Sequence, residues 1–204
     1  VRLLPDWEIL PYDSFSPHQD IISTRIQTLH QLPEQKHGVL ILPISTLMHR
    51  LPPLSFITAS ALFLEPGQKL DSIALRQRFT DAGYTAVDTV YEHGEFAIRG
   101  AIIDLYPMGS ELPLRIDLFD DEIDTIRTFD PESQRSIDKV DRVRLLPAKE
   151  FPFHQDAITR FKQRWRERFD VDHTCCPIYQ DVSSGLTPPG IEYYAPLFFE
   201  QSAT

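Results

Sequence analysis

The chain is poor in features that would assign it to a secreted or membrane-bound class of protein. Its 204 residues include two cysteines, which are adjacent at Cys175 and Cys176. Neighbouring cysteines close a strained ring when they bridge, and no metal-type Cys or His spacing surrounds them, so we expect free thiols in a reducing cytosol. No apolar run approaches the roughly 18 residues of a membrane span, and the start does not resemble a signal peptide. We therefore expect a cytoplasmic protein without a membrane partner.

Positive charge is scarce. The 20 Lys and Arg residues face 30 Asp and Glu residues, which gives a net charge of −10 and a pI near 5.1. Residues 61–147 alone hold 17 acidic and 10 basic side chains. Such a chain lacks the general basic field with which proteins collect nucleic acid. The charge balance therefore favours a protein partner over autonomous DNA binding.

Motifs of common catalytic and ligand sites are missing. No G-x-x-x-x-G-K-[ST] phosphate loop and no G-x-S-x-G elbow occurs in the sequence, so we expect no ATP turnover, no catalytic residues and no cofactor. The segment 92–95, Glu-His-Gly-Glu, lacks the two helical histidines of a zincin. The acidic cluster 117–124 lacks the central glycine of a calcium loop, so we expect no metal either.

The hydrophobic content of 42% is enough to build a core, and the first sixty residues predict one α/β unit. Residues Asp20–Leu32 carry apolar side chains at helical spacing. The continuous apolar run Val39–Leu42 is typical of a strand buried in a parallel sheet. The chain starts at Val1 and enters an apolar stretch directly, so we expect it to be a piece of a longer polypeptide.

The middle of the chain predicts a small α+β domain. A helix is expected over Asp71–Ala82, with Ile73, Leu75 and Phe79 as packing positions and Gly83 as its C-cap. Strands are expected near 85–91, 95–105, 112–119, 122–129 and 139–146, joined by short links rich in Gly, Pro, Asp and Ser. A helix followed by meandering strands is typical of an α+β layer.

A further helix is predicted over Asp156–Phe169, and the rest of the chain is expected to be irregular. Five cations between Arg160 and Arg168 form a basic face on this helix, which is usually only a solvated surface. The proline clusters near 52–53 and 147–152 mark two boundaries. We therefore expect an α/β body made of residues 1–60 and 148–204, with residues 61–147 inserted as a separate α+β antiparallel-sheet domain.

The most informative segment is 95–122. Leu114, Ile116 and Leu118 alternate with Arg115 and Phe119, so a strand that buries the aliphatic side chains turns Phe119 outward beside Arg115. In the preceding segment the apolar phase switches at Arg99-Gly100, where a glycine permits a bulge that would direct Arg99 outward. Exposed Phe and Arg side chains together are typical of partner surfaces.

Two interpretations of these arginines stay open on pattern alone. Surface arginines often pair with carboxylates on neighbouring strands, and Asp104, Asp117 and Glu95 are within reach of such pairing. The other interpretation is a binding surface centred on Arg99, Arg115 and Phe119.

The same residues carry a resemblance to a known family. The run F-x-x-R-G-x-x-x-D-L-x-P over 96–107, then L-R-I-D-L-F-D-D-E-I-D from 114 and T-F-D-P-x-S-Q-R from 128, resembles the small second domain shared by the excision-repair protein UvrB and the N-terminal module of bacterial transcription-repair coupling factors. Residues 4–20 and 190–199 resemble the coupling factors specifically. The resemblance covers nearly the whole chain.

The resemblance implies a helicase-like body, incomplete here, that the small domain interrupts. It implies that Arg99, Arg115 and Phe119 contact UvrA, so that excision repair is recruited to stalled RNA polymerase without catalysis by these residues. RNA polymerase and DNA would be bound, and ATP hydrolysed, by other domains of the parent protein. Segment 7–13 is too short for the DNA-wedging hairpin of UvrB.

Two alternatives accompany this interpretation. The chain could be a fragment of a UvrB-type DNA helicase that handles damaged DNA, and the basic face from Arg160 to Arg168 would then contact DNA. The resemblance also implies that the C-terminal part of a coupling factor masks the same surface of the small domain within one molecule.

Overall fold

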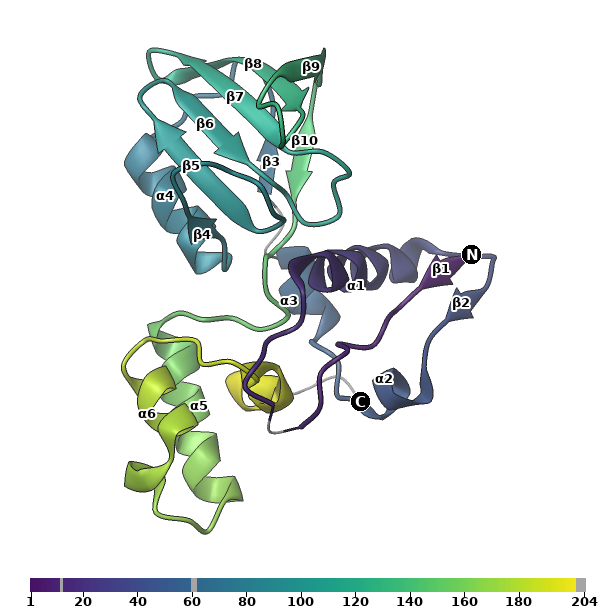
Figure 1. Cartoon of the computed structure of the whole chain (residues 1–204), viewed down its shortest axis with the longest axis vertical. Coiled ribbons are helices and arrows are strands. Elements are labelled where there is room, and N and C mark those ends of the chain that lie inside the picture. Colours follow the sequence, from purple (N-terminus) through teal and green to yellow (C-terminus); the bar gives the residue numbers. More distant parts are fainter. Residues whose placement is uncertain (12, 60–61, 201–204) are drawn as a thin grey trace.

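The computed structural model describes residues 1–11, 13–59 and 62–200. The described elements form a mixed α/β fold with antiparallel sheets, which confirms that part of the predicted fold class. Figure 1 shows three groups: a sheet domain, a group around α1, and a helical group of α5 and α6. The expected boundary at residues 60 and 61 lies outside the described residues. No helix of the described residues is long and apolar enough to cross a membrane.

The N-terminal group contains a short parallel pair of strands and three helices. Strand β1 (Arg2–Leu3) pairs with β2 (Leu40–Ile41), and helix α1 (Gln19–Gln31) matches the predicted helix within one residue. The 3-10 turn η1 (Leu32–Glu34) follows α1. Helices α2 (Ile44–Met48) and α3 (Leu54–Ala59) follow β2.

The burial predicted for Val39–Leu42 is wrong in the described part of the chain. The strand is two residues long, and Val39 and Ile41 are 56% and 52% exposed. A strand at this position would be buried only if further strands and helices covered both faces of its sheet. In the described residues the sheet consists of β1 and β2 alone.

The middle of the chain forms a six-stranded sheet beside a helix and a strand pair. The sheet has the order β4 (Thr85–Ala86), β5 (Glu95–Arg99), β6 (Ile102–Leu105), β7 (Leu114–Phe119), β8 (Glu122–Phe129), β9 (Ser136–Lys139). All neighbours are antiparallel except β4 and β5. Strand β3 (Leu62–Leu64) pairs with β10 (Val143–Leu145), so the first and last strands of this region lie side by side.

Helix α4 (Ser72–Asp81) matches the helix expected over Asp71–Ala82 within one residue at each end. The Asp71 carboxylate accepts hydrogen bonds from the backbone N–H groups of the first turn, which otherwise have no partner. Gly83 follows the helix with φ 90°, a conformation that favours glycine. Leu75 and Phe79 are buried as predicted, whereas Ile73 is exposed, because it is two residues from Leu75 and so lies about 200° around the helix from it.

Two further predictions about the strands need correction. The expected single strand 95–105 is a hairpin of β5 and β6, in which Arg99 pairs with Ile102 across a turn and Gly100 has φ 63°. The phase switch of the apolar residues therefore comes from a reversal of the chain and not from a bulge. A register shift does occur between Asp117 and Leu118 on β7.

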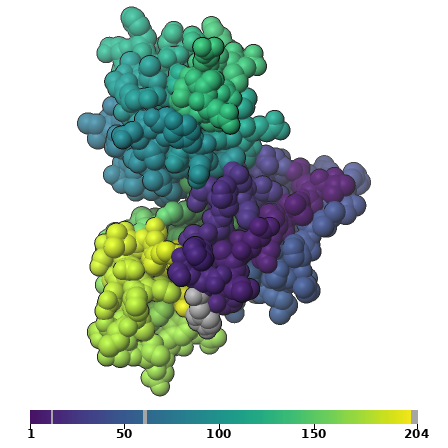
Figure 2. Space-filling model, in the orientation of Figure 1, coloured from purple at the N-terminus to yellow at the C-terminus, as the bar shows by residue number. Residues whose placement is uncertain are grey.

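The core of the sheet domain continues into the N-terminal group. One face of the sheet buries an apolar set that packs on α4, namely Phe96, Ile103, Leu105, Ile116 and Ile126. Trp7, Ile22 and Ile26 belong to the same apolar cluster. Figure 2 shows the sheet domain as a separate mass that rests on the N-terminal residues.

The C-terminal group has its own core. Helix α5 (Gln155–Arg168) buries Phe161 and Trp165, as the spacing predicts. The residues after it were expected to be irregular, but they form η2 (His173–Cys175), α6 (Pro177–Ser183) and η3 (Ile191–Phe198). These short elements pack their aromatic side chains against α5. Tertiary packing stabilises turns that are too short to show a periodic pattern.

A buried ion pair joins the N-terminal and C-terminal segments. Arg25 on α1 and Glu150 after β10 are both almost fully buried. Arg25 Nε and Nη2 lie 2.5 and 3.1 Å from the two carboxylate oxygens of Glu150, and Arg25 Nη1 donates to the Pro5 carbonyl oxygen at 2.6 Å. The guanidinium also lies 5.0 Å from the centroid of the Trp7 ring. Removing one partner would therefore leave a buried charge without compensation.

We expect Glu150→Gln to lower the free energy of unfolding by about 3–5 kcal/mol, because Arg25 would keep its charge in a dry site. Urea denaturation followed by circular dichroism measures the change. The matched control is Glu65→Gln, which removes the partner of Arg142 from an exposed pair and should cost less than about 1 kcal/mol. Equal losses for both variants would contradict the role of the buried pair.

Candidate protein-binding surface

The outer face of the six-stranded sheet carries polar side chains in register across three strands. Asp104 on β6 lies opposite Ala97 on β5 and opposite Arg115 on β7. Arg99 on β5 lies opposite Ile102, and Ile102 is two residues before Asp104 on β6. Because side chains alternate across a strand, Arg99, Asp104 and Arg115 all point away from the face that packs on α4.

The structure brings Arg99 and Arg115 together on the Asp104 carboxylate. Arg115 Nε and Nη2 donate to the two oxygens of Asp104 at 2.7 and 3.0 Å, as a two-pronged fork. Arg99 Nη2 donates to Oδ2 of the same carboxylate. Asp104 is fully buried, whereas the side chain of Arg99 is 48% exposed and that of Arg115 is 18% exposed. Of the carboxylates considered from the sequence, Asp104 is the one that both arginines use.

Further contacts fix the Arg115 guanidinium. Arg115 Nη1 donates to the Gln134 carbonyl oxygen at 3.0 Å, and the guanidinium carbon lies 4.7 Å from the centroid of the Phe129 ring. The hydrogen bonds to Asp104 raise the pKa of Arg115, so it stays charged. Arg99 is held more loosely, by Asp104 and by a 3.5 Å contact of Nη1 with the Asp88 carbonyl oxygen.

Phe119 is 80% exposed, as the sequence predicts. It ends β7 opposite Glu122, after the register shift at Asp117, and Asp120 follows it with φ 58° in the hairpin turn. A hollow lies beside this hairpin, lined by residues that include Lys69, Gly100 and Leu118. Among the described residues, no ring or cation–π contact joins Phe119 to Arg99 or Arg115. Phe119 therefore stands apart from the arginine pair, on the same strand as Arg115.

The sequence analysis named Asp104 only as one possible carboxylate partner of the two arginines, and it missed the burial of Asp104. The signal was present, because Asp104 stands between Ile103 and Leu105 inside a strand. Aspartate is unfavourable in strand interiors, and a carboxylate in that place needs cations across the neighbouring strands.

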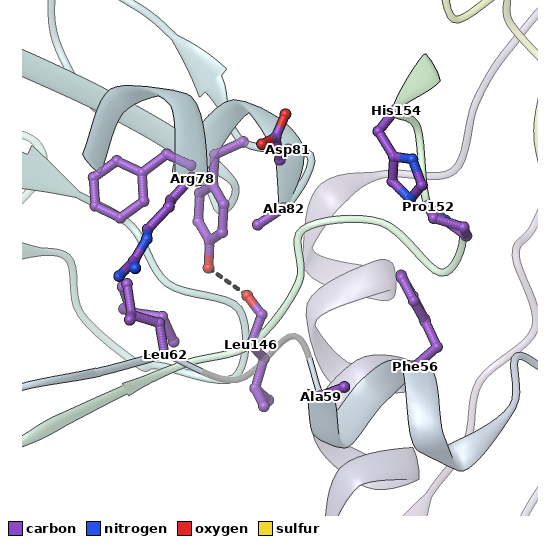
Figure 3. A pocket seen from close by; sticks show the side chains of 12 residues that line it. Phe56, Ala59, Leu62, Arg78, Asp81, Ala82, Leu146, Pro152 and His154 are labelled. Carbon is purple, nitrogen blue, oxygen red and sulfur yellow. Dashed lines mark hydrogen bonds between the residues drawn. The ribbon is translucent and has the colours of Figure 1, made fainter. Parts of the chain in front are cut away.

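A pocket of about 370 Å³ lies between the sheet domain and the helical groups (Figure 3). Phe56 of α3 lines it together with the end of α4, and Arg78 and His154 stand on opposite sides of it. The Tyr84 hydroxyl donates to the Leu146 carbonyl oxygen at 2.7 Å, and burial raises the pKa of Tyr84, which keeps the phenol protonated. No two ionisable side chains of the described lining are bonded to each other.

The other groups weighed from the sequence have structural contacts. Within the described residues, no group of three or more His, Cys, Asp or Glu side chains is placed to hold a metal. His93 bonds the Asp20 carboxylate and the Ser110 carbonyl oxygen. On α5, Arg160 donates to the Phe198 carbonyl oxygen and Arg166 to the Tyr179 hydroxyl. Part of the basic face therefore holds the C-terminal group together.

Comparisons with known proteins identify the family of the chain. A family model described as "UvrB interaction domain" matches residues 62–151. The transcription-repair-coupling factor of Escherichia coli is 56% identical over 201 residues, which are 98% of this chain and 18% of that protein. The one from Haemophilus influenzae is 49% identical over 209 residues, with 100% and 18% covered. The one from Bacillus subtilis is 33% identical over 164 residues, with 80% and 14% covered.

The chain thus spans about a fifth of the length of the curated relatives that it matches. The matched range 62–151 contains the whole six-stranded sheet and the strand pair that closes it. It also contains Arg99, Asp104, Arg115 and Phe119. The chain belongs, as one segment that includes a UvrB interaction domain, to the family of the transcription-repair-coupling factors.

Proposed function

We propose that this chain binds UvrA through the surface formed by Arg99, Arg115 and Phe119, and so recruits nucleotide excision repair to stalled RNA polymerase. The observation that carries the proposal is an exposed phenylalanine on the same strand as one of two paired arginines, within a UvrB interaction domain. The sequence motifs of this domain resemble those with which UvrB and the coupling factors contact UvrA.

The chemistry of the surface suits a protein partner. Phe119 offers a large apolar side chain that loses its water when a partner covers it. Arg99 and Arg115 keep N–H groups beyond those bonded to Asp104, and these can donate to carboxylate or carbonyl oxygens. Aromatic and arginine side chains together are enriched among the residues that dominate binding energies.

We further propose that residues 1–60 and 148–204 are parts of one incomplete helicase-like body into which residues 61–147 are inserted. The exposed apolar side chains of the β1–β2 pair support this, because a parallel sheet is stable when both faces are covered. RNA polymerase and DNA would bind other parts of a full coupling factor, whose C-terminal part could mask the UvrA surface. We place the protein in the cytoplasm.

Phe119→Ala should lower the affinity for purified UvrA by about 1–3 kcal/mol, because the variant loses the apolar anchor. Isothermal titration calorimetry of the chain with UvrA measures the change. Folding should be unaffected, since Phe119 is 80% exposed. Arg160→Ala, on the basic face of α5, is the control and should bind UvrA like the parent.

The arginine variants test both UvrA binding and folding. Arg99→Ala or Arg115→Ala should also weaken UvrA binding, but Arg115→Ala leaves Asp104 buried beside one cation and should lower the melting temperature as well. If all three alanine variants are folded and bind UvrA like the parent, the proposed surface is not the docking site.

Mg-ATP at millimolar concentration should leave the melting temperature of the chain unchanged, because the sequence has no phosphate loop to hold the nucleotide. Differential scanning fluorimetry with and without nucleotide measures this. ATP hydrolysis that a point mutation within these residues abolishes would overturn the assignment of a binding role without catalysis.

A further inference from the structure

Asp104 is a charged side chain with no exposed surface on the outer face of a sheet. A carboxylate is expensive to remove from water and is retained in such a place only when cations and hydrogen bonds satisfy it. Here both of its oxygens are bonded, by Arg115 on one neighbouring strand and by Arg99 on the other. The carboxylate therefore connects β5, β6 and β7 at one point of the outer face.

The Asp104 carboxylate also fixes where the two guanidinium groups point. Arg115 uses two adjacent N–H groups for the fork, and a third is bonded to the Gln134 carbonyl oxygen, while the Phe129 ring lies against the guanidinium. Arg99 has fewer contacts, so the bond to Asp104 is its main restraint. Without the carboxylate, the two positive charges on β5 and β7, which flank β6, would repel each other.

The pair Asp117 and Arg127 on the same face makes a useful contrast. Its nitrogen and oxygen are 3.9 Å apart, and both side chains are partly exposed. Such a pair contributes little to stability, and the Asp117 carboxylate has a closer partner in the Thr125 hydroxyl, which donates to it at 2.9 Å. On this face of the sheet, the burial of the carboxylate and the hydrogen bonds to both of its oxygens distinguish the Asp104 cluster from this pair.

We propose that Asp104 is a positioning residue of the UvrA-binding surface, holding Arg99 and Arg115 so that their free N–H edges face the partner. This inference rests on the proposed function. The cluster of two guanidinium groups and one carboxylate carries one net positive charge, so the group that it fits on UvrA is a single carboxylate flanked by carbonyl oxygens. The arginines are ordered before binding, which lowers the conformational entropy lost when UvrA docks.

The test is Asp104→Asn, which keeps the shape of the side chain and removes its charge. We expect the affinity for purified UvrA, measured by calorimetry, to fall about tenfold or more, in the range of a binding hot spot. Asp138→Asn is the matched control, because Asp138 is an exposed residue of the same sheet, on β9. It should change the affinity less than about twofold.

A double-mutant cycle separates positioning from a general loss of structure. If Asp104 acts through the arginines, Asp104→Asn should have a much smaller effect on UvrA affinity in a protein that already carries Arg115→Ala. Arg115→Lys is the second probe: it keeps the charge but cannot form the fork, so we expect it to weaken binding although it remains a cation. It also serves if Asp104→Asn does not fold.

The outcomes are distinct. A folded Asp104→Asn variant that binds UvrA like the parent, effects that simply add in the cycle, or full binding by Arg115→Lys would each overturn the positioning role. If Phe119→Ala, Arg99→Ala and Arg115→Ala also bind like the parent, it is the proposed function that fails.

Discussion

The contact between Arg25 and Glu150 is the interaction on which the arrangement of the chain depends. The two residues are 125 positions apart, and between them the chain builds the entire sheet domain and returns. Their pairing attaches the segment after β10, where the chain leaves the sheet domain, to α1. The Pro5 carbonyl oxygen and the Trp7 ring bind the same guanidinium and so attach the N-terminal segment as well. A buried pair of this kind adds little net stability, but its geometry excludes other arrangements of the same segments.

The outer face of the sheet domain also has a buried carboxylate bonded to arginine, but there the arginines are partly exposed. The Asp104 carboxylate is as deeply buried as Glu150, yet its cations reach the surface. One side of the sheet therefore provides stability through apolar packing on α4, and the other side holds charged groups in place through the buried Asp104 carboxylate. The two roles do not compete, because alternating residues of the same strands supply them.

Much of this fold could be predicted from the sequence, because α1, α4 and α5 carry clear helical spacing and the strand pattern of β7 exposes Phe119. The errors arose where the pattern depends on distant residues. Gly100 reads equally well as a bulge or as a turn until the partner strand is known. Val39 and Ile41 look buried because their sequence suits a covered parallel strand. The burial of Asp104 depends on two arginines that reach it from different strands, and the periodicity of residues along one strand does not show contacts between strands.

The pairing of β3 with β10 determines how the sheet domain connects to the rest of the chain. Leu62 lies opposite Leu145, so the first and last strands of the sheet domain bring its two ends together. A domain whose two ends are adjacent takes the place of a short surface loop without altering the course of the host chain. Because the strand pair of β3 and β10 fixes the spacing of the two ends, changes elsewhere in the sheet domain need not alter the positions at which the flanking segments begin and end.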